Sequence, residues 1–188
     1  MEYFDILNED GTRTGRIKER SLVHRDGDLH GSVRTYIFRK VHNNFEILLQ
    51  KRSTDKDSYP GCFDVSSAGH VDSGEEFIDA AVRELNEELG IKAKEEDFIF
   101  LFRQKLIAKD IFHKNIFISN EINNVYILEK NVDISNINYD INEVQSVKWM
   151  DTDEVLDNLE RGNKEFCIGL EEYKKVLAAL AQTNHSYV

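Results

Sequence analysis

The sequence predicts an α+β fold arranged as an α/β/α sandwich around one mixed sheet. Short strand-like runs come first, one helix with a single apolar face lies in the middle, and further strands and two helices complete the chain. The 188 residues suit one core rather than two domains, and neither the single proline nor any Gly- or Ser-rich run marks a linker. We therefore expect one domain, residues 31–188, with an N-terminal strand extension, residues 1–30, packed on its core.

The first part of the chain is expected to form two β-hairpins. The runs YFDIL and TGRIK flank the turn NEDGT, and the longer runs SVRTYIF and FEILLQKR flank HNN. In both pairs, residues that favour strands surround a turn rich in Asn, Asp or Gly. The chain therefore begins with antiparallel pairs.

A helix follows the loop YPGCFDVSSAGH, because the apolar spacing changes there to about 3.6 residues. Ser73 followed three residues later by Glu76 fits a capping box, which would fix the start of this helix. Gly90 can adopt the left-handed conformation that ends a helix. The expected apolar face consists of Phe77, Ile78, Ala81, Val82, Leu85 and Leu89.

The second half of the chain predicts four more strands and two closing helices. The strand-like runs are FIFLFRQKLI, HKNIFIS, NNVYILE and SVKWM. The helical runs are DTDEVLDNLERG and CIGLEEYKKVLAALAQ, and the second of these has one apolar face. That face is formed by Ile168, Tyr173, Val176, Leu177 and Leu180.

Charge and composition restrict the class of protein. The formal net charge is −11, whereas a protein that binds nucleic acid by neutralising phosphates needs clustered Lys and Arg. No run approaches the ~20 apolar residues of a membrane span, and the N-terminus has no basic segment before an apolar one. Two cysteines, Cys62 and Cys167, do not make a disulfide framework. We expect a cytoplasmic protein with no nucleic-acid or membrane partner, and a homodimer is compatible with these observations.

Three glutamates are crowded on one side of the predicted central helix. Glu84, Glu87 and Glu88 stand at i, i+3 and i+4 and can converge on one point. Like charges at this spacing destabilise a helix by roughly 0.2–0.5 kcal/mol per pair, and the helix dipole disfavours anions near its C-terminus. A divalent cation such as Mg²⁺ or Mn²⁺ reverses this effect, because it needs several oxygen ligands. A solvated acidic face is the alternative that the triplet alone leaves open.

The residues around the triplet complete a specific pattern. The stretch from Gly69 to Ile91 reads G-x5-E-x7-R-E-U-x-E-E-x-G-U, in which U is an aliphatic residue. This pattern resembles the Nudix box with every defining position filled. The resemblance covers about residues 31–165. It implies the Nudix fold, in which a mixed sheet lies between helices and the box forms a loop–helix–loop.

The resemblance implies a role for each polar residue of the box. Glu75 and Arg83 would be structural supports, because an Arg–carboxylate pair can tie the loop to the helix. The three glutamates of the triplet would be catalytic as well as metal-binding. The implied ligands of Mg²⁺ or Mn²⁺ are the carbonyl of Gly69 and the side chains of Glu84, Glu87 and Glu88.

The implied reaction is hydrolysis of a diphosphate that joins a nucleoside to another group X. Bound cations neutralise phosphate oxygens and activate a water, so the metal supplies the positive charge that an acidic chain lacks. The expected partner is thus a small nucleotide diphosphate substrate. A non-catalytic nucleotide-binding Nudix module is one alternative.

A second alternative is an isomerase. The segments before the box look like those of Nudix proteins related to isopentenyl diphosphate isomerase, in which a cysteine two residues before a histidine moves a proton at carbon. The matching positions here are Ala68 and His70. Alanine cannot transfer a proton, and Cys62 lies early in the loop. Hydrolysis is therefore favoured over isomerisation.

Several residues outside the box are further candidates. The family resemblance implies an extra acid after the box, and Glu143 is preferred as this catalytic residue over Glu121. A lone histidine is more often a surface or hydrogen-bonded group than a ligand, so no metal role is assigned to the histidines. These are His24, His30 and His70. The candidate substrate-binding residues are Arg34, Lys51, Arg52 and Tyr59.

Overall fold

The computed structural model describes residues 1–56, 58–112 and 115–183. Its main sheet is mixed, with strand order β5-β4-β3-β8-β7 and with β6 paired to β3 and β9 paired to β4. Strands β3 and β8 run parallel, and the other pairs of this sheet are antiparallel. The helices and strands are β1 (Tyr3–Leu7), β2 (Arg13–Glu19), α1 (Arg20–Asp26), β3 (His30–Val41), β4 (Asn44–Arg52), β5 (Phe63–Asp64), β6 (Ser67–His70), α2 (Phe77–Leu89), η1 (Glu95–Asp97), β7 (Ile99–Phe112), β8 (Asn115–Glu129), η2 (Ile134–Asn136), β9 (Val144–Asp151), α3 (Thr152–Glu160) and α4 (Leu170–Thr183).

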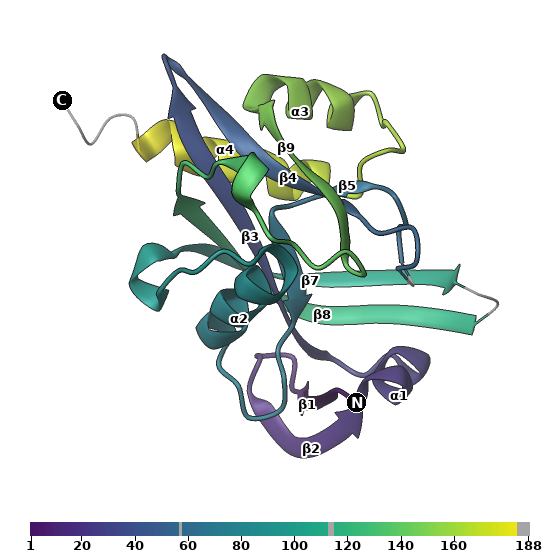
Figure 1. Ribbon diagram of the computed structural model, residues 1–188. Helices are drawn as coiled ribbons and strands as arrows, with labels where there is room; N and C mark the ends of the chain where they lie inside the picture. The colour runs from purple at the N-terminus through teal and green to yellow at the C-terminus, as the bar shows by residue number, and fades with distance from the viewer. Residues whose placement is uncertain (57, 113–114, 184–188) are drawn as a thin grey trace.

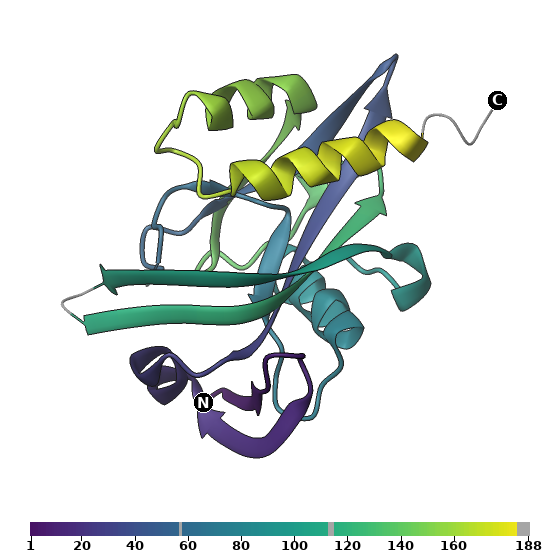
Figure 2. The ribbon, with the colours of Figure 1, turned by 180° about the vertical axis from the view of Figure 1, so that it is seen from behind.

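Helices cover both faces of the main sheet, which confirms the predicted sandwich (Figure 1). Successive side chains of a strand point to opposite faces, so Ile47 and Leu49 pack with α3 and α4, while Leu48 packs with α2. The face that α2 buries includes Ala81, Leu85 and Leu89, as its apolar spacing predicts. Figure 2 shows α3 and α4 together on the other side of the sheet.

The N-terminal hairpin, β1 and β2, forms a separate two-stranded sheet. It lies next to the loop before α2, at one end of the main sheet (Figure 1). Phe4 and Ile6 of β1 and Val23 of α1 are buried together in a small apolar cluster of their own. Leu7 packs with Ile122 of β8, and its amide donates to the Leu29 carbonyl at 2.7 Å, so packing and a hydrogen bond fasten the hairpin to the main sheet.

The capping box predicted for α2 is wrong. The helix begins at Phe77, and Glu76, its N-cap residue, makes no side-chain capping hydrogen bond. The Ser73 hydroxyl instead donates to Asp5 of the hairpin, at 3.3 Å. The Ser73 hydroxyl therefore bonds to a residue that is distant in the sequence, and it does not cap the helix as the local pattern predicts. Gly90 ends α2 in the left-handed conformation, as expected, with φ 64°.

Further elements differ from the sequence predictions. The runs HKNIFIS and NNVYILE belong to one long strand, β8, because both pair continuously with β7; the first two residues of HKNIFIS lie outside the described residues. The last helix begins at Leu170 rather than at Cys167. Helix α1 was not predicted, since its seven residues are too few to show a clear apolar period.

None of the described helices is both long enough and apolar enough to cross a lipid bilayer.

Candidate active site

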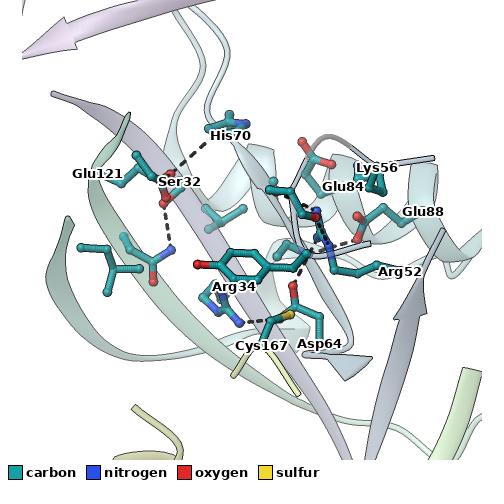
Figure 3. A pocket seen from close by; sticks show the side chains of 18 of the residues that line it. Ser32, Arg34, Arg52, Lys56, Asp64, His70, Glu84, Glu88, Glu121 and Cys167 are labelled. Carbon is teal, nitrogen blue, oxygen red and sulfur yellow. Dashed lines mark hydrogen bonds and ion pairs between the residues drawn. The ribbon is translucent and has the colours of Figure 1, made fainter. Parts of the chain in front are cut away.

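A groove of about 1360 Å³ runs past the start of β6 and along one side of α2. Several parts of the chain line it, among them β3 and β6, the C-terminal half of α2, β7 and β8, the start of α4, and the loops before β5 and β9. Figure 3 shows Glu84 and Glu88 beside Lys56 and Arg52 at one end, and His70 with Glu121 at another. The predicted box residues Gly69, Arg83, Glu84, Glu87 and Glu88 all line this groove.

Gly69 lies in direct contact with the carboxyl group of Glu84. A Cβ added at Gly69 would stand 2.0 Å from Glu84 Cδ and 2.1 Å from Glu84 Oε1, which is closer than side chains can approach. Burial raises the pKa of Glu84, and the neighbouring Arg83 opposes this rise only in part. Glycine at position 69 therefore lets a carboxylate lie directly against the backbone of β6.

Glu88 is the most deeply buried acid of the box, with 4% of its surface exposed. Its Oε2 accepts hydrogen bonds from the Ala68 amide at 3.0 Å and from Gln50 Nε2 at 3.1 Å. Burial raises the pKa of Glu88 to about 8, and the charge of Glu84 adds to this rise. Two neighbouring carboxyl groups therefore lie in a site that disfavours their charges.

This arrangement fits a divalent cation. Oxygen ligands in a low-dielectric site are unfavourable when charged and alone, and a hard cation such as Mg²⁺ offsets that charge. Glu84, Glu88 and the backbone of Gly69 would supply the oxygen ligands. The chemistry of these donors matches the ions that the sequence pattern implied.

Glu87 is the most exposed of the three glutamates. Its side chain is 58% exposed, and its Oε2 accepts a hydrogen bond from Arg83 Nη1 at 3.0 Å. The same Nη1 donates to Glu84 Oε1 at 2.8 Å. Arg83 therefore holds Glu84 and Glu87 side by side at the groove, whereas Glu88 is buried; the role of all three glutamates as metal ligands stays a prediction.

Arg83 joins the loop before α2 to the helix. Its Nε and Nη2 donate to the two carboxylate oxygens of Glu75, both at 2.9 Å, and Nη2 also donates to the His70 carbonyl at 2.9 Å. Glu75 in turn accepts from the Asp72 amide at 3.0 Å. The Arg–carboxylate pair expected between Arg83 and Glu75 is present, and its guanidinium also touches two of the box glutamates.

Arg83→Lys should lower the affinity for Mg²⁺ by about 10-fold, because an ammonium cannot donate to Glu75, His70 and the box glutamates at once. Isothermal titration with Mg²⁺ measures this effect. Arg161→Lys is the matched control, since Arg161 is exposed and its guanidinium pairs with Asp157 on α3. Equal Mg²⁺ affinity in the two variants would remove the supporting role of Arg83.

Two of the predicted substrate-binding residues meet at a buried acid in the groove. Arg34 Nη2 donates to Asp64 Oδ1 at 2.5 Å, and Arg52 Nη1 donates to Asp64 Oδ2 at 3.3 Å. Arg34 also pairs with Glu172 of α4 at 3.0 Å, and Glu172 accepts from Tyr36 and Gln104. The paired acids hold both guanidinium groups in place at the groove wall. The acids were missed, because only the fold brings them to the arginines.

The other two candidates differ in position. Tyr59 lines the groove at its edge, is 45% exposed and has a positive φ of 48°. Lys51 is not among the lining residues, and its Nζ lies 5.5 Å from the centre of the Phe63 ring. Its neighbours Gln50 and Arg52 contact Glu88 and Asp64 in the groove, whereas the Lys51 ammonium lies over the Phe63 ring. Lys51 therefore lies outside the groove lining in this structure, and its part in substrate binding stays a prediction.

Glu143 and Glu121, the two acids considered outside the box, both line the groove. Glu143 forms an ion pair with Lys56, from the loop across the groove, and its side chain is 39% exposed. Glu121 is almost buried, and its Oε1 lies 3.7 Å from His70 Nε2 and 3.9 Å from His30 Nε2. Glu143 is therefore the more accessible of the two acids.

Three histidines that looked separate in the sequence lie together. Their ligand atoms all lie within 4.8 Å of one another, and within the described ranges His24, His30 and His70 are the group of this kind that could hold a metal ion. Burial lowers the pKa of His24 to about 3 and that of His30 to about 4, so both are neutral at pH 7. Their Nε2 atoms are buried without a hydrogen-bond partner. Neutral imidazoles beside Glu121 form a donor set suited to a transition metal.

Comparisons with known sequences show the family to which this chain belongs. The model of the NUDIX domain matches residues 28–167. Nudix hydrolase 3 of Arabidopsis thaliana is 46% identical over 129 residues, which are 68% of this chain and 16% of that protein. An uncharacterized Nudix hydrolase of Clostridium acetobutylicum is 36% identical over 160 residues, 84% of this chain and 75% of that protein. An isopentenyl-diphosphate Delta-isomerase of Rhizobium rhizogenes is 29% identical over 148 residues, 77% of this chain and 65% of that protein.

Solved structures agree on the fold. A crystal structure from Deinococcus radiodurans has a TM-score of 0.69 at 20% identity and covers 93% of this chain and 98% of that one. The NUDIX domain of Shewanella oneidensis NrtR, complexed with ADP ribose, has a TM-score of 0.57 at 16% identity and covers 81% of this chain and 87% of that one. The family model spans most of this chain and the sandwich is shared, so the chain belongs to the Nudix family.

Proposed function

We propose that this chain hydrolyses a diphosphate linkage in a nucleoside diphosphate derivative, with Mg²⁺ or Mn²⁺ as its cofactor. One observation carries the proposal: Glu88 and Glu84 lie together in a buried site beside Gly69, where a divalent cation would offset their charge. The named Nudix hydrolases among the relatives support a hydrolase over a binding module.

The residues of the groove divide the work between them. Glu84, Glu88 and the backbone of Gly69 would hold the cation, which when bound neutralises phosphate oxygens and activates a water. Arg52 and Arg34, held by Asp64, orient the anionic substrate along the groove wall. Both arginines keep their positions before substrate arrives, because their acidic partners fix them.

Glu143 is the proposed acid outside the box. Its carboxylate lies at the groove, is accessible to solvent and pairs with a lysine that itself lines the groove. Glu121 is less suited to accept a proton, because its burial beside His30 and His70 comes with a pKa well below the ordinary value. Burial alone would raise this pKa, but the contact with His70 and the hydrogen bond from the Ser119 hydroxyl favour the charged form.

The nucleotide part of the substrate rests on one neighbour. The NUDIX domain of NrtR was solved with ADP ribose, a nucleoside diphosphate joined to a sugar. A groove of about 1360 Å³ has room for a ligand of that size. The group X is therefore sought among sugars and second nucleosides joined through diphosphate.

A panel of nucleoside diphosphate derivatives and dinucleotides, incubated with Mg²⁺ or Mn²⁺, tests this function. At least one compound should release a nucleoside monophosphate, and excess chelator should abolish its release. Tight binding of a nucleotide without any cleavage, with either metal, would replace hydrolysis by the binding-module alternative.

Isopentenyl diphosphate should yield no dimethylallyl product. Ala68 stands in the groove where isomerisation needs a proton donor, and Cys62 is not among the groove's lining residues. Cys167 does line the groove, but burial raises the pKa of its thiol and Asp64 lies next to it. Product analysis by mass spectrometry measures the outcome, and isomer formed by the unmodified protein but lost in Cys62→Ser or Cys167→Ser would support the isomerase instead.

A further inference from the structure

The N-terminal hairpin contacts residues 73–75, in the loop that precedes α2; we call this segment the metal-binding loop. The Ser73 amide donates to the Tyr3 carbonyl at 2.8 Å, and the Gly74 amide donates to Asp5 Oδ2 at 2.8 Å. Arg13 Nη2 donates to the Glu75 carbonyl at 2.6 Å. Three consecutive residues of the loop therefore have a partner on the hairpin.

The irregular pairing of the hairpin places Asp5 and Arg13 next to the loop. The register of the hairpin shifts between Asp5 and Leu7, and Arg13 is the residue opposite Leu7. Such an irregularity re-aims side chains, and here Arg13 Nε pairs with Asp5 Oδ2 at 3.1 Å. The side chain of Asp5 is 14% exposed and that of Arg13 is 42% exposed, so the contact with the loop lies at the surface with the Asp5 carboxylate as its more buried partner. Charged hydrogen bonds of this kind are stronger than neutral ones.

The contact continues from the loop to the glutamates of the box. Glu75, whose carbonyl Arg13 holds, receives two hydrogen bonds from Arg83. Arg83 then donates to Glu84 and Glu87. Two residues, Glu75 and Arg83, therefore lie between the hairpin and the carboxylates that face the groove. The matched NUDIX model begins at residue 28, so the hairpin lies outside the part of the chain that defines the family.

We propose that the N-terminal hairpin is a brace for the metal-binding loop, with Asp5 and Arg13 as positioning residues for the cation site. The inference rests on the proposed function in taking the box as that site. The hairpin fixes residues 73–75, these fix Glu75, and Glu75 orients Arg83 against Glu84. Ligand precision depends on such outer contacts, whose loss commonly weakens metal binding by about 10-fold or more.

The test uses the full chain with Asp5→Asn or Arg13→Ala. The control is Arg16→Ala, which removes a charge from the same hairpin; Arg16 pairs with Asp28 at 3.5 Å, and among the described residues no hydrogen bond or ion pair joins its side chain to residues 73–75. Hydrogen exchange at the Ser73 and Gly74 amides is measured without metal, and Mg²⁺ affinity is measured by calorimetry without substrate. Mg²⁺ is the probe because it prefers oxygen ligands and avoids the histidine cluster.

Both brace variants should exchange these amides about 10-fold faster and bind Mg²⁺ about 10-fold more weakly than the Arg16→Ala control. Exchange and affinity equal to the control would overturn the brace. Faster exchange with unchanged Mg²⁺ affinity would also overturn it, because the hairpin would then be only a structural cover. Asp5→Asn and Arg13→Ala act on different atoms, so a folding failure of one leaves the other as the test.

A failure of the proposed function gives a different result. Two outcomes are then possible. In the first, the unmodified protein binds no Mg²⁺ at the box. In the second, it binds Mg²⁺ but cleaves no diphosphate. In the first case the two exchange rates still decide whether the hairpin holds the loop. In the second, the affinities of the brace variants decide whether it positions the ligands.

Discussion

Glu88→Gln should reduce turnover of the best substrate by about 100-fold or more and weaken Mg²⁺ binding in parallel. Glutamine keeps the size and helix propensity of glutamate, and its carbonyl can still accept from the Ala68 amide and Gln50. It removes the negative charge that a buried cation needs. Charge stabilisation by such a metal contributes several kcal/mol to the transition state, and each 1.4 kcal/mol is about tenfold in rate.

The measurement combines steady-state kinetics with Mg²⁺ calorimetry. Glu95→Gln is the control, since Glu95 lies exposed in η1, outside the groove. Glu88→Gln should keep the circular dichroism spectrum of the unmodified protein, so that its loss of activity reports on the site and not on folding. Full turnover of Glu88→Gln, or of the unmodified protein in excess chelator, would contradict a cation at the box.

The metal-free protein should lose stability as the pH rises from about 5 to 8, and Glu88 should account for a large part of that loss. The folded protein holds the pKa of Glu88 at about 8, whereas the ordinary value is 4.5. Between these values the folded state keeps a proton that the unfolded state has released, so the free energy of unfolding falls as the pH rises. The loss is complete above the folded pKa and amounts to on the order of a few kcal/mol.

Urea unfolding at the two ends of this range measures the effect. Other groups titrate there as well: His24 and His30 have lowered pKa values and act in the opposite direction at the acidic end. The difference between the unmodified protein and Glu88→Gln isolates the contribution of Glu88. With saturating Mg²⁺, the unmodified protein should lose most of the fall in stability that Glu88 causes as the pH rises, because the cation binds the charged carboxylate. The same pH dependence in both proteins would show that Glu88 is not held in a charge-disfavouring site.

The parts of the fold that the sequence could predict are those with a local cause. Helix α2 has its apolar residues at helical spacing and Gly90 at its end, so both its face and its C-terminus follow from a window of residues. The strands β3 and β4 likewise follow from runs of strand-favouring residues around a short turn. The acidic triplet was recognisable because its pattern lies within one loop and one helix.

The rest depends on contacts between distant parts of the chain. The capping box failed because Asp5, far away in the sequence, takes the Ser73 hydroxyl. The histidine cluster was missed because α1, β3 and β6 each contribute one residue, and only the pairing of β3 with β6 brings His30 near His70. No local spacing encodes such a meeting.

The pairing of Arg34 with Asp64 and Glu172 has the same origin. These residues come from β3, β5 and α4, and the sheet order sets their separation. An arginine in a strand can equally well face solvent, so sequence alone offered Arg34, Lys51 and Arg52 on equal terms. Only the folded structure distinguishes Lys51, whose ammonium lies over the Phe63 ring, from Arg52, which reaches the groove.

Hydrolysis in heavy-oxygen water tests the central claim most directly. The best substrate of the panel is cleaved in labelled water with Mg²⁺, and mass spectrometry locates the label in the products. Water attack at phosphorus predicts one labelled oxygen on a phosphate of one product, with the bond between X and its own phosphate intact. Label on the carbon of X, or label transfer that persists in Glu88→Gln without metal, would contradict metal-dependent hydrolysis of the diphosphate at this site.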